Sequence, residues 1–102
     1  MVARISVNQK ELIAFCRRHG IRKLAFFGSV LREDFRPESD IDVLVEFEPE
    51  VDRQLTYFRM ARAQLELEQL LGRAVELSLA NALDHRLRDE ILQTAEVQYD
   101  AA

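Results

Sequence analysis

Residues 40–47, DIDVLVEF, decide the fold, because apolar and acidic side chains alternate along them. Successive side chains of a strand point to opposite faces of its sheet. The apolar residues at the odd-numbered positions would therefore face a core, while Asp40 and Asp42 begin the opposite face. The stretch predicts a strand with one buried face and one face that starts acidic.

Further strands are predicted on both sides of this stretch. Residues 23–27 form an apolar run ended by a glycine, which predicts a buried strand. Residues 74–79 repeat the alternation with Glu76 on the polar side, and residues 97–99 predict a short last strand. If the two alternating strands are neighbours, Glu76 can join Asp40 and Asp42.

Three stretches have apolar residues at the spacing that is typical of helices. The first, residues 6–19, is expected to begin with a capping box of Ser6 and Gln9. The second covers residues 51–71, and the third has Asn81 as its cap. A further short helix could begin at residues 29–31, so the predicted fold is α/β (α+β), a small mixed sheet flanked by about four helices.

Length, charge and composition narrow the class of protein. The 102 residues suffice for one domain, and the net charge of −4 argues against direct nucleic-acid binding, which needs a basic face. The one cysteine, Cys16, excludes an internal disulfide and lies among apolar helix residues, as a core thiol does. Without a signal-peptide core or an apolar run of about 20 residues, we expect a cytoplasmic protein with no membrane segment. Because so small a domain gains stability from a partner subunit, a homo- or hetero-oligomer is expected.

Asp40 and Asp42 point to one side of the predicted strand, close enough to share one or two hard cations. Magnesium prefers a few carboxylates together with phosphate oxygens, and two metal ions can stabilise both the attacking and the leaving oxygen of an in-line displacement. The pair therefore points to phosphoryl or nucleotidyl transfer. By itself, an Asp-x-Asp pattern is more commonly a solvated strand face, so both interpretations stay open.

Gly28 and Ser29 follow the buried strand at residues 23–27. Glycine lets the backbone approach a ligand closely, and the amides that open the next segment form a ready phosphate site. The Ser29 hydroxyl can add to this site, and Arg32, about one helical turn later, can reach the same phosphate. An isolated Gly-Ser pair also fits a tight turn with a serine cap. No P-loop, zinc-protease or esterase motif occurs in the chain.

Gly28-Ser29, ten intervening residues and Asp40-x-Asp42 together resemble the signature of the DNA polymerase β-like nucleotidyltransferase superfamily. More closely, FGSVLR (27–32), PESDIDVLV (37–45) and GRAVEL (72–77) are similar to the minimal nucleotidyltransferase (MNT) proteins of prokaryotes. The likeness spans most of the chain. It implies a single nucleotidyltransferase domain over residues 1–102, with ATP as substrate and two Mg²⁺ ions as cofactors.

The resemblance also implies roles for individual residues. The catalytic acids and metal ligands would be Asp40, Asp42 and Glu76. The nucleotide would be contacted by Gly28, Ser29, Arg32 and Ser39. Glu76 departs from the family pattern, which usually has aspartate there. Because its side chain is one methylene longer, either the side chain must retract or the metal must shift for Glu76 to serve equally.

Many proteins of this family are antitoxins of an all-helical HEPN ribonuclease, and some transfer AMP to a tyrosine of that toxin. The resemblance therefore implies a protein adenylyltransferase antitoxin whose partners are ATP and a HEPN-family toxin. Two alternatives stay open, an antitoxin that neutralises its toxin by binding alone and a nucleotidyltransferase that acts on a small hydroxyl compound.

Overall fold

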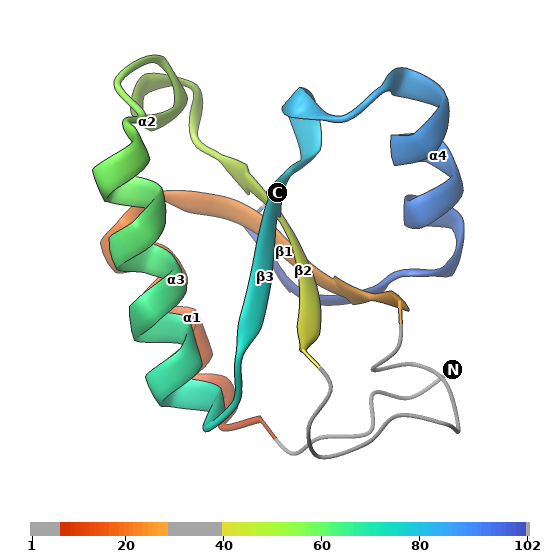
Figure 1. The fold of residues 1–102 in the computed structure, drawn as a ribbon. Coiled ribbons are helices and arrows are strands. Elements are labelled where there is room, and N and C mark those ends of the chain that lie inside the picture. Colours follow the sequence, from red (N-terminus) through yellow and green to blue (C-terminus); the bar gives the residue numbers. More distant parts are fainter. Residues whose placement is uncertain (1–6, 29–39, 102) are drawn as a thin grey trace.

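A four-stranded mixed sheet lies at the centre of the molecule, and its strand order is β3-β2-β1-β4 (Figure 1). The computed structural model describes residues 7–28 and 40–101. β1 pairs antiparallel with both β2 and β4, while β2 and β3 run parallel. The strands are β1 (Ile21–Phe27), β2 (Ile41–Phe47), β3 (Val75–Leu79) and β4 (Glu96–Asp100). The mixed sheet predicted from the sequence is confirmed.

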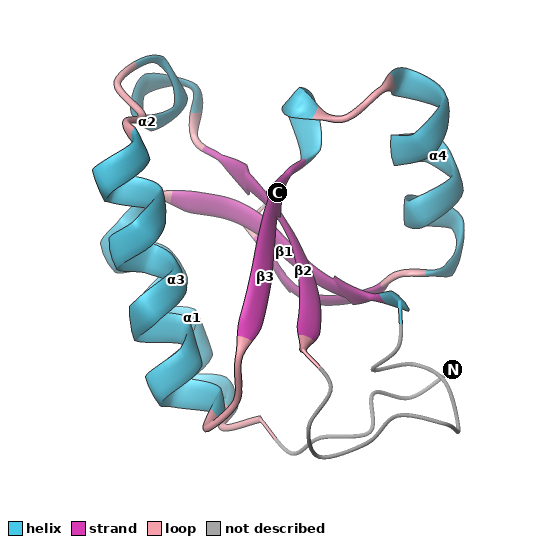
Figure 2. Cartoon of the chain, in the orientation of Figure 1, coloured by secondary structure: helices cyan, strands magenta, loops and turns pink. Residues whose placement is uncertain are grey.

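Helices cover the two sides of the sheet unequally (Figure 2). The helices are α1 (Gln9–His19), α2 (Pro49–Arg53), α3 (Tyr57–Leu71) and α4 (His85–Thr94), with a short 3-10 turn, η2 (Ala80–Ala82), after β3. α1 and α3 pack side by side on one face, whereas α4 lies on the other side of the sheet (Figure 1). No residue of α4 is buried, so the two faces differ in how tightly they are covered.

The hydrophobic core fills the space between the sheet and the α1–α3 layer. α1 contributes Leu12 and Phe15, α3 contributes Leu67, and β2 contributes its odd-numbered residues, as the alternation in residues 40–47 predicts. Burying each such side chain contributes about 1.5–3 kcal/mol. The apolar side of β2 is thereby fixed against the helices, and its acidic side is turned away from them.

Two predicted helix starts are wrong. α1 begins at Gln9 and is capped by Asn8, whose side chain accepts a hydrogen bond from the Glu11 amide at 3.1 Å, rather than by a box that includes Ser6. Ser6 itself lies outside the described residues. α4 is capped by Asp84, and Asn81 lies in η2, where its amide donates to Asp52 Oδ2 at 2.9 Å. In both cases several Asn, Ser or Asp residues lie near the start, and the backbone selects the one that reaches a free amide.

The single helix predicted over residues 51–71 is two helices, α2 and α3. Thr56 interrupts it, with an extended backbone (φ −119°, ψ 163°) and an Oγ1 that accepts a hydrogen bond from the Arg59 amide at 3.2 Å. Leu55 lies in the break yet packs on the core. The apolar spacing therefore continues across the break, which hides it from a search for helical periodicity. The stop at Gly72 is as predicted, with a left-handed φ of 70°.

No helix in the described part of the chain is both long and apolar enough to span a bilayer.

Candidate functional site

The acidic start of β2 lies on the sheet face turned away from α1 and α3. Asp40 is exposed and directly precedes the strand, and Asp42 is half-buried between the buried Ile41 and Val43. Side-chain alternation places Asp42 on the polar side of β2, whereas Asp40 precedes the strand. Both have interactions with other groups of the molecule.

β3 brings Glu76 beside Asp42, because the two residues are register partners in the parallel pairing of β2 and β3. Neighbouring strands lie about 4.8 Å apart, so these side chains start next to each other on one face. The start of β3 is held in two ways, since the Ile41 amide donates to the Ala74 carbonyl and the Val75 amide donates to Glu68 Oε2, both at 2.9 Å. The predicted proximity of Asp42 and Glu76 is therefore found, with Glu76 exposed to solvent.

Gly28 touches the same carboxylate from the end of β1. Its backbone has a φ of 74°, in the left-handed region that favours glycine. A Cβ built on Gly28 would lie 2.3 Å from Asp42 Oδ2 and 3.2 Å from Asp42 Cγ. The absence of a side chain on Gly28 therefore leaves room for the Asp42 carboxylate.

The donor set at this edge fits a magnesium ion in its chemistry. Mg²⁺ takes hard oxygen ligands and is usually held by one or two protein carboxylates, with phosphate and water oxygens completing the shell. Asp42 and Glu76 supply two such carboxylates from adjacent strands, and a Cβ at Gly28 would intrude on the Asp42 oxygen. Within residues 7–28 and 40–101, no group of three or more His, Cys, Asp or Glu side chains is gathered closely enough to hold a metal ion. Asp42 and Glu76 are thus the two predicted ligands that the described structure brings together, and Asp40 does not form a group of three with them.

Three of the predicted nucleotide contacts, Ser29, Arg32 and Ser39, lie outside the described residues. Of that group the structure places Gly28 alone. Gly28 and Asp42 are near each other because Phe27 and Asp42 are register partners in β1 and β2.

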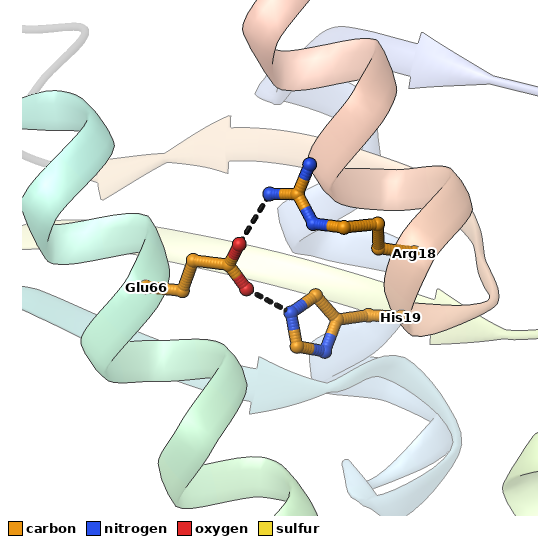
Figure 3. A network of polar contacts seen from close by, with 3 residues as sticks. All are labelled: Arg18, His19 and Glu66. Atoms are coloured by element: carbon orange, nitrogen blue, oxygen red, sulfur yellow. Dashed lines mark hydrogen bonds and ion pairs between the residues drawn. The ribbon is translucent and has the colours of Figure 1, made fainter.

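A polar network on the opposite side of the molecule was not predicted. Glu66 of α3 accepts one hydrogen bond from Arg18 and pairs with the His19 ring, and these two contacts tie α3 to the end of α1 (Figure 3). The hydrogen bond with His19, assisted by Arg18, lowers the pKa of Glu66 below its usual range. The His19 ring also packs against Phe15 at 4.8 Å between centroids. The partner of His19 is 47 residues away in the sequence, beyond what local patterns reveal.

The positions of Cys16 and His85 are explained by structural roles, without a catalytic one. Cys16 is buried, and desolvation raises its pKa to about 12, so the thiol is a core residue as predicted. His85 pairs with Asp89, one helical turn away, at 3.5 Å. Both side chains are exposed on α4, which makes the contact a surface pair.

Comparison with known protein families gives a match over most of the chain. The family model described as "Nucleotidyltransferase domain" matches residues 10–97. A relative from Methanocaldococcus jannaschii, provisionally named a protein adenylyltransferase, is 32% identical over 91 residues, which cover 89% of this chain and 94% of that protein. The protein adenylyltransferase MntA of Thermococcus cleftensis is 33% identical over 89 residues, 87% of this chain and 83% of its own length.

Solved structures share the fold. A structure assigned provisionally as a minimal nucleotidyltransferase is 38% identical, with a TM-score of 0.71 and 85% coverage of both chains. A toxin–antitoxin complex with AMP-PNP has a TM-score of 0.73 at 18% identity, covering 92% of this chain and 74% of that one. A complex of a tri-AMPylated HEPN toxin of Shewanella oneidensis with its MNT antitoxin has a TM-score of 0.64 at 17% identity, covering 90% and 69%. At these low identities the last two show a common fold.

Proposed function

The chain belongs to the nucleotidyltransferase domain family, and from that premise we propose that it is an antitoxin that transfers AMP from ATP to a tyrosine hydroxyl of a HEPN-family toxin. The observation that carries the proposal is the in-register pair of Asp42 and Glu76, with Gly28 against the Asp42 carboxylate. Both curated relatives carry the name of protein adenylyltransferases and cover most of the chain. The complexes named above support ATP and a toxin as partners, because those structures contain an ATP analogue in one case and an AMP-modified toxin in the other.

In the proposed reaction the acceptor oxygen attacks the α-phosphorus of ATP, an O–P bond forms, and the bond to pyrophosphate breaks as pyrophosphate leaves with the electron pair. Mg²⁺, when bound, neutralises charge on the phosphates. Asp40, Asp42 and Glu76 are the proposed ligands of up to two such ions, and Gly28, Ser29, Arg32 and Ser39 are the proposed contacts to the nucleotide.

Glu76 is the proposed acceptor of the hydroxyl proton. Asp42 is half-buried and its carboxylate lies close to Gly28, whereas Glu76 is exposed on the edge strand β3. An exposed carboxylate at the sheet edge is open to a group that arrives on a second protein. The longer side chain of Glu76, which departs from the family's aspartate, extends that reach by one methylene.

The test is transfer of label from ATP in the presence of Mg²⁺ to the protein encoded beside this chain. We expect label on a tyrosine of that protein, loss of labelling in Asp42→Asn, and unchanged labelling in Asp89→Asn, a matched change at an exposed acid of α4. Absence of label on the partner with every nucleoside triphosphate would refute the proposal.

A second function, neutralisation of the toxin by binding alone, is favoured by one observation. Among the described residues, Asp42 and Glu76 form a pair of acids at the sheet edge, and no group of three or more acids, histidines or cysteines could hold a metal ion. Asp42→Asn separates the two functions, since a variant that binds and neutralises as well as the parent while transferring no AMP would make catalysis dispensable.

A further inference from the structure

One residue, Glu68, organises the turn through which α3 leads into β3 (Figure 1). Its backbone carbonyl accepts hydrogen bonds from the amides of Gly72 and Arg73, at 2.8 and 3.3 Å. Oε2 of its side chain accepts a further one from the Val75 amide at 2.9 Å. Glu68 thus receives three amides between the end of α3 and the first residue of β3, directly before Glu76.

The peptide between Ala74 and Val75 is held on both sides. Its carbonyl accepts a hydrogen bond from the Ile41 amide of β2 at 2.9 Å. Because the N–H of a trans peptide points opposite to its carbonyl, the Val75 amide points away from β2. β3 lies at the edge of the four-stranded sheet that the described residues form, so no strand of that sheet receives this amide. Glu68 supplies the acceptor that a further strand would otherwise supply.

The electrostatics of α3 do not explain a glutamate at position 68. Glu68 begins the last turn of the helix, where the carbonyl ends carry a partial negative charge that disfavours a carboxylate. The last turn of α3 contains no basic residue that would offset this repulsion. A hydrogen bond to a charged acceptor is about twice as strong as one to a neutral acceptor, and the Val75 amide makes such a bond here. The strand that Glu68 holds therefore explains its position better than the helix to which it belongs.

The same peptide connects the strand ends that carry the acids of the proposed site. Ile41 stands between Asp40 and Asp42, and Val75 directly precedes Glu76. Burial of apolar side chains fixes the register of β3 to a whole residue, but the ends of elements still fray and open locally. A hydrogen bond on the outer side of the first peptide restrains that motion next to Glu76.

We propose that Glu68 is a positioning residue of the transferase site, which holds the start of β3 so that the Glu76 carboxylate stays beside Asp42. The inference rests on the proposed function for the role of Glu76. It adds that a residue of the helix layer, on the other side of the sheet from the acids, sets the rate of transfer through the backbone of β3.

Steady-state AMP transfer to the protein encoded beside this chain tests the inference. Glu68→Ala should lower kcat about tenfold to hundredfold, because a misplacement of about 1 Å can cost a hundredfold. KM for ATP should stay within about twofold, since the proposed nucleotide contacts lie outside β3. Glu68→Gln keeps an oxygen that accepts the Val75 amide and should keep most of the rate. Glu68→Asp draws the oxygen back by one methylene, and its kcat should also fall, which decides the matter if the alanine variant does not fold.

Thr56→Ala is the matched control, because it removes a side-chain hydrogen bond to an amide at the other end of α3. Thr56→Ala and Glu68→Ala should both lower the unfolding temperature by about 4–8 °C. Only Glu68→Ala should lose transfer when the proteins are assayed well below that temperature. In the metal-free protein, exchange of the Val75 amide, followed by NMR, should accelerate about tenfold or more in Glu68→Ala and not in Thr56→Ala.

A double variant shows whether Glu68 acts through Glu76. Glu68→Ala should slow Glu76→Gln no further, whereas the losses of two independent residues would multiply. Multiplied losses, parental kcat in Glu68→Ala, unaccelerated exchange of Val75, or a Glu68→Gln as slow as Glu68→Ala would each overturn the inference.

If the parent transfers no AMP, the proposed function fails and binding of Mn²⁺, followed by electron paramagnetic resonance, decides the inference. Affinity about tenfold or more weaker in Glu68→Ala, with parental affinity in Thr56→Ala, would sustain the positioning role without the proposed catalysis. Equal affinity in Glu68→Ala and the parent, or a parent that binds no Mn²⁺, would overturn it.

Discussion

Replacing Gly28 by alanine separates the two reasons for glycine at the end of β1. The first is conformational, since a φ of 74° costs an L-residue about 1–2 kcal/mol. The second is contact, because the new Cβ would lie 2.3 Å from Asp42 Oδ2, inside the 3.0 Å below which real Cβ contacts are essentially never found. The carboxylate or the strand end must move by several tenths of an ångström. Since a misplacement of about 1 Å can cost a hundredfold in rate, AMP transfer should fall about tenfold to hundredfold.

Gly72→Ala provides the matched control. Gly72 also has a positive φ, 70°, but a Cβ there would meet no atom within 4 Å. We expect both variants to lose about 1–2 kcal/mol of unfolding free energy in urea titrations, a cost that a domain stable by about 5–15 kcal/mol survives. Only Gly28→Ala should lose transferase activity. Parental activity in Gly28→Ala, or an equal loss in Gly72→Ala, would refute the role assigned to the Gly28–Asp42 contact.

Three further predictions concern single side chains. Glu76→Gln should slow AMP transfer by about a hundredfold or more if Glu76 takes the acceptor proton, while Glu76→Asp should keep most of the rate; similar rates for all three proteins would exclude that role. Glu66→Gln should reduce unfolding free energy by less than about 1 kcal/mol, because the network is partly exposed. The lowered pKa of Glu66 means that its contribution exists at neutral pH and disappears as pH falls below about 4, so parent and variant should then unfold alike. With burial raising its pKa to about 12, Cys16 should resist alkylation at pH 8 until the protein is unfolded, and rapid labelling of the native protein would contradict the buried position.

Local sequence patterns were sufficient to predict the strands and the strand faces on which Asp42 and Glu76 lie. The alternation in residues 40–47 and 75–79 predicts which faces are buried, and it places Asp42 and Glu76 on polar faces. Patterns of this kind report one segment at a time. They do not reveal the Thr56 break, because the apolar spacing persists across it. Nor do they reveal the partner of Glu66 on α1, since that contact depends on how two helices pack.

The core that folds the protein also sets the spacing of the acids. Val75, Leu77 and Leu79 pair with the apolar side of β2, and a slip of one residue would send Glu76 into the helix layer and Leu77 to the acidic face. Burial of the apolar residues forbids that slip, so the Asp42–Glu76 pairing follows from folding without any metal to assemble it. The same register puts Leu77 and Leu79 at the pocket between α3 and β3. One edge strand therefore carries both the apolar residues that fix its register and the acid that this register places beside Asp42.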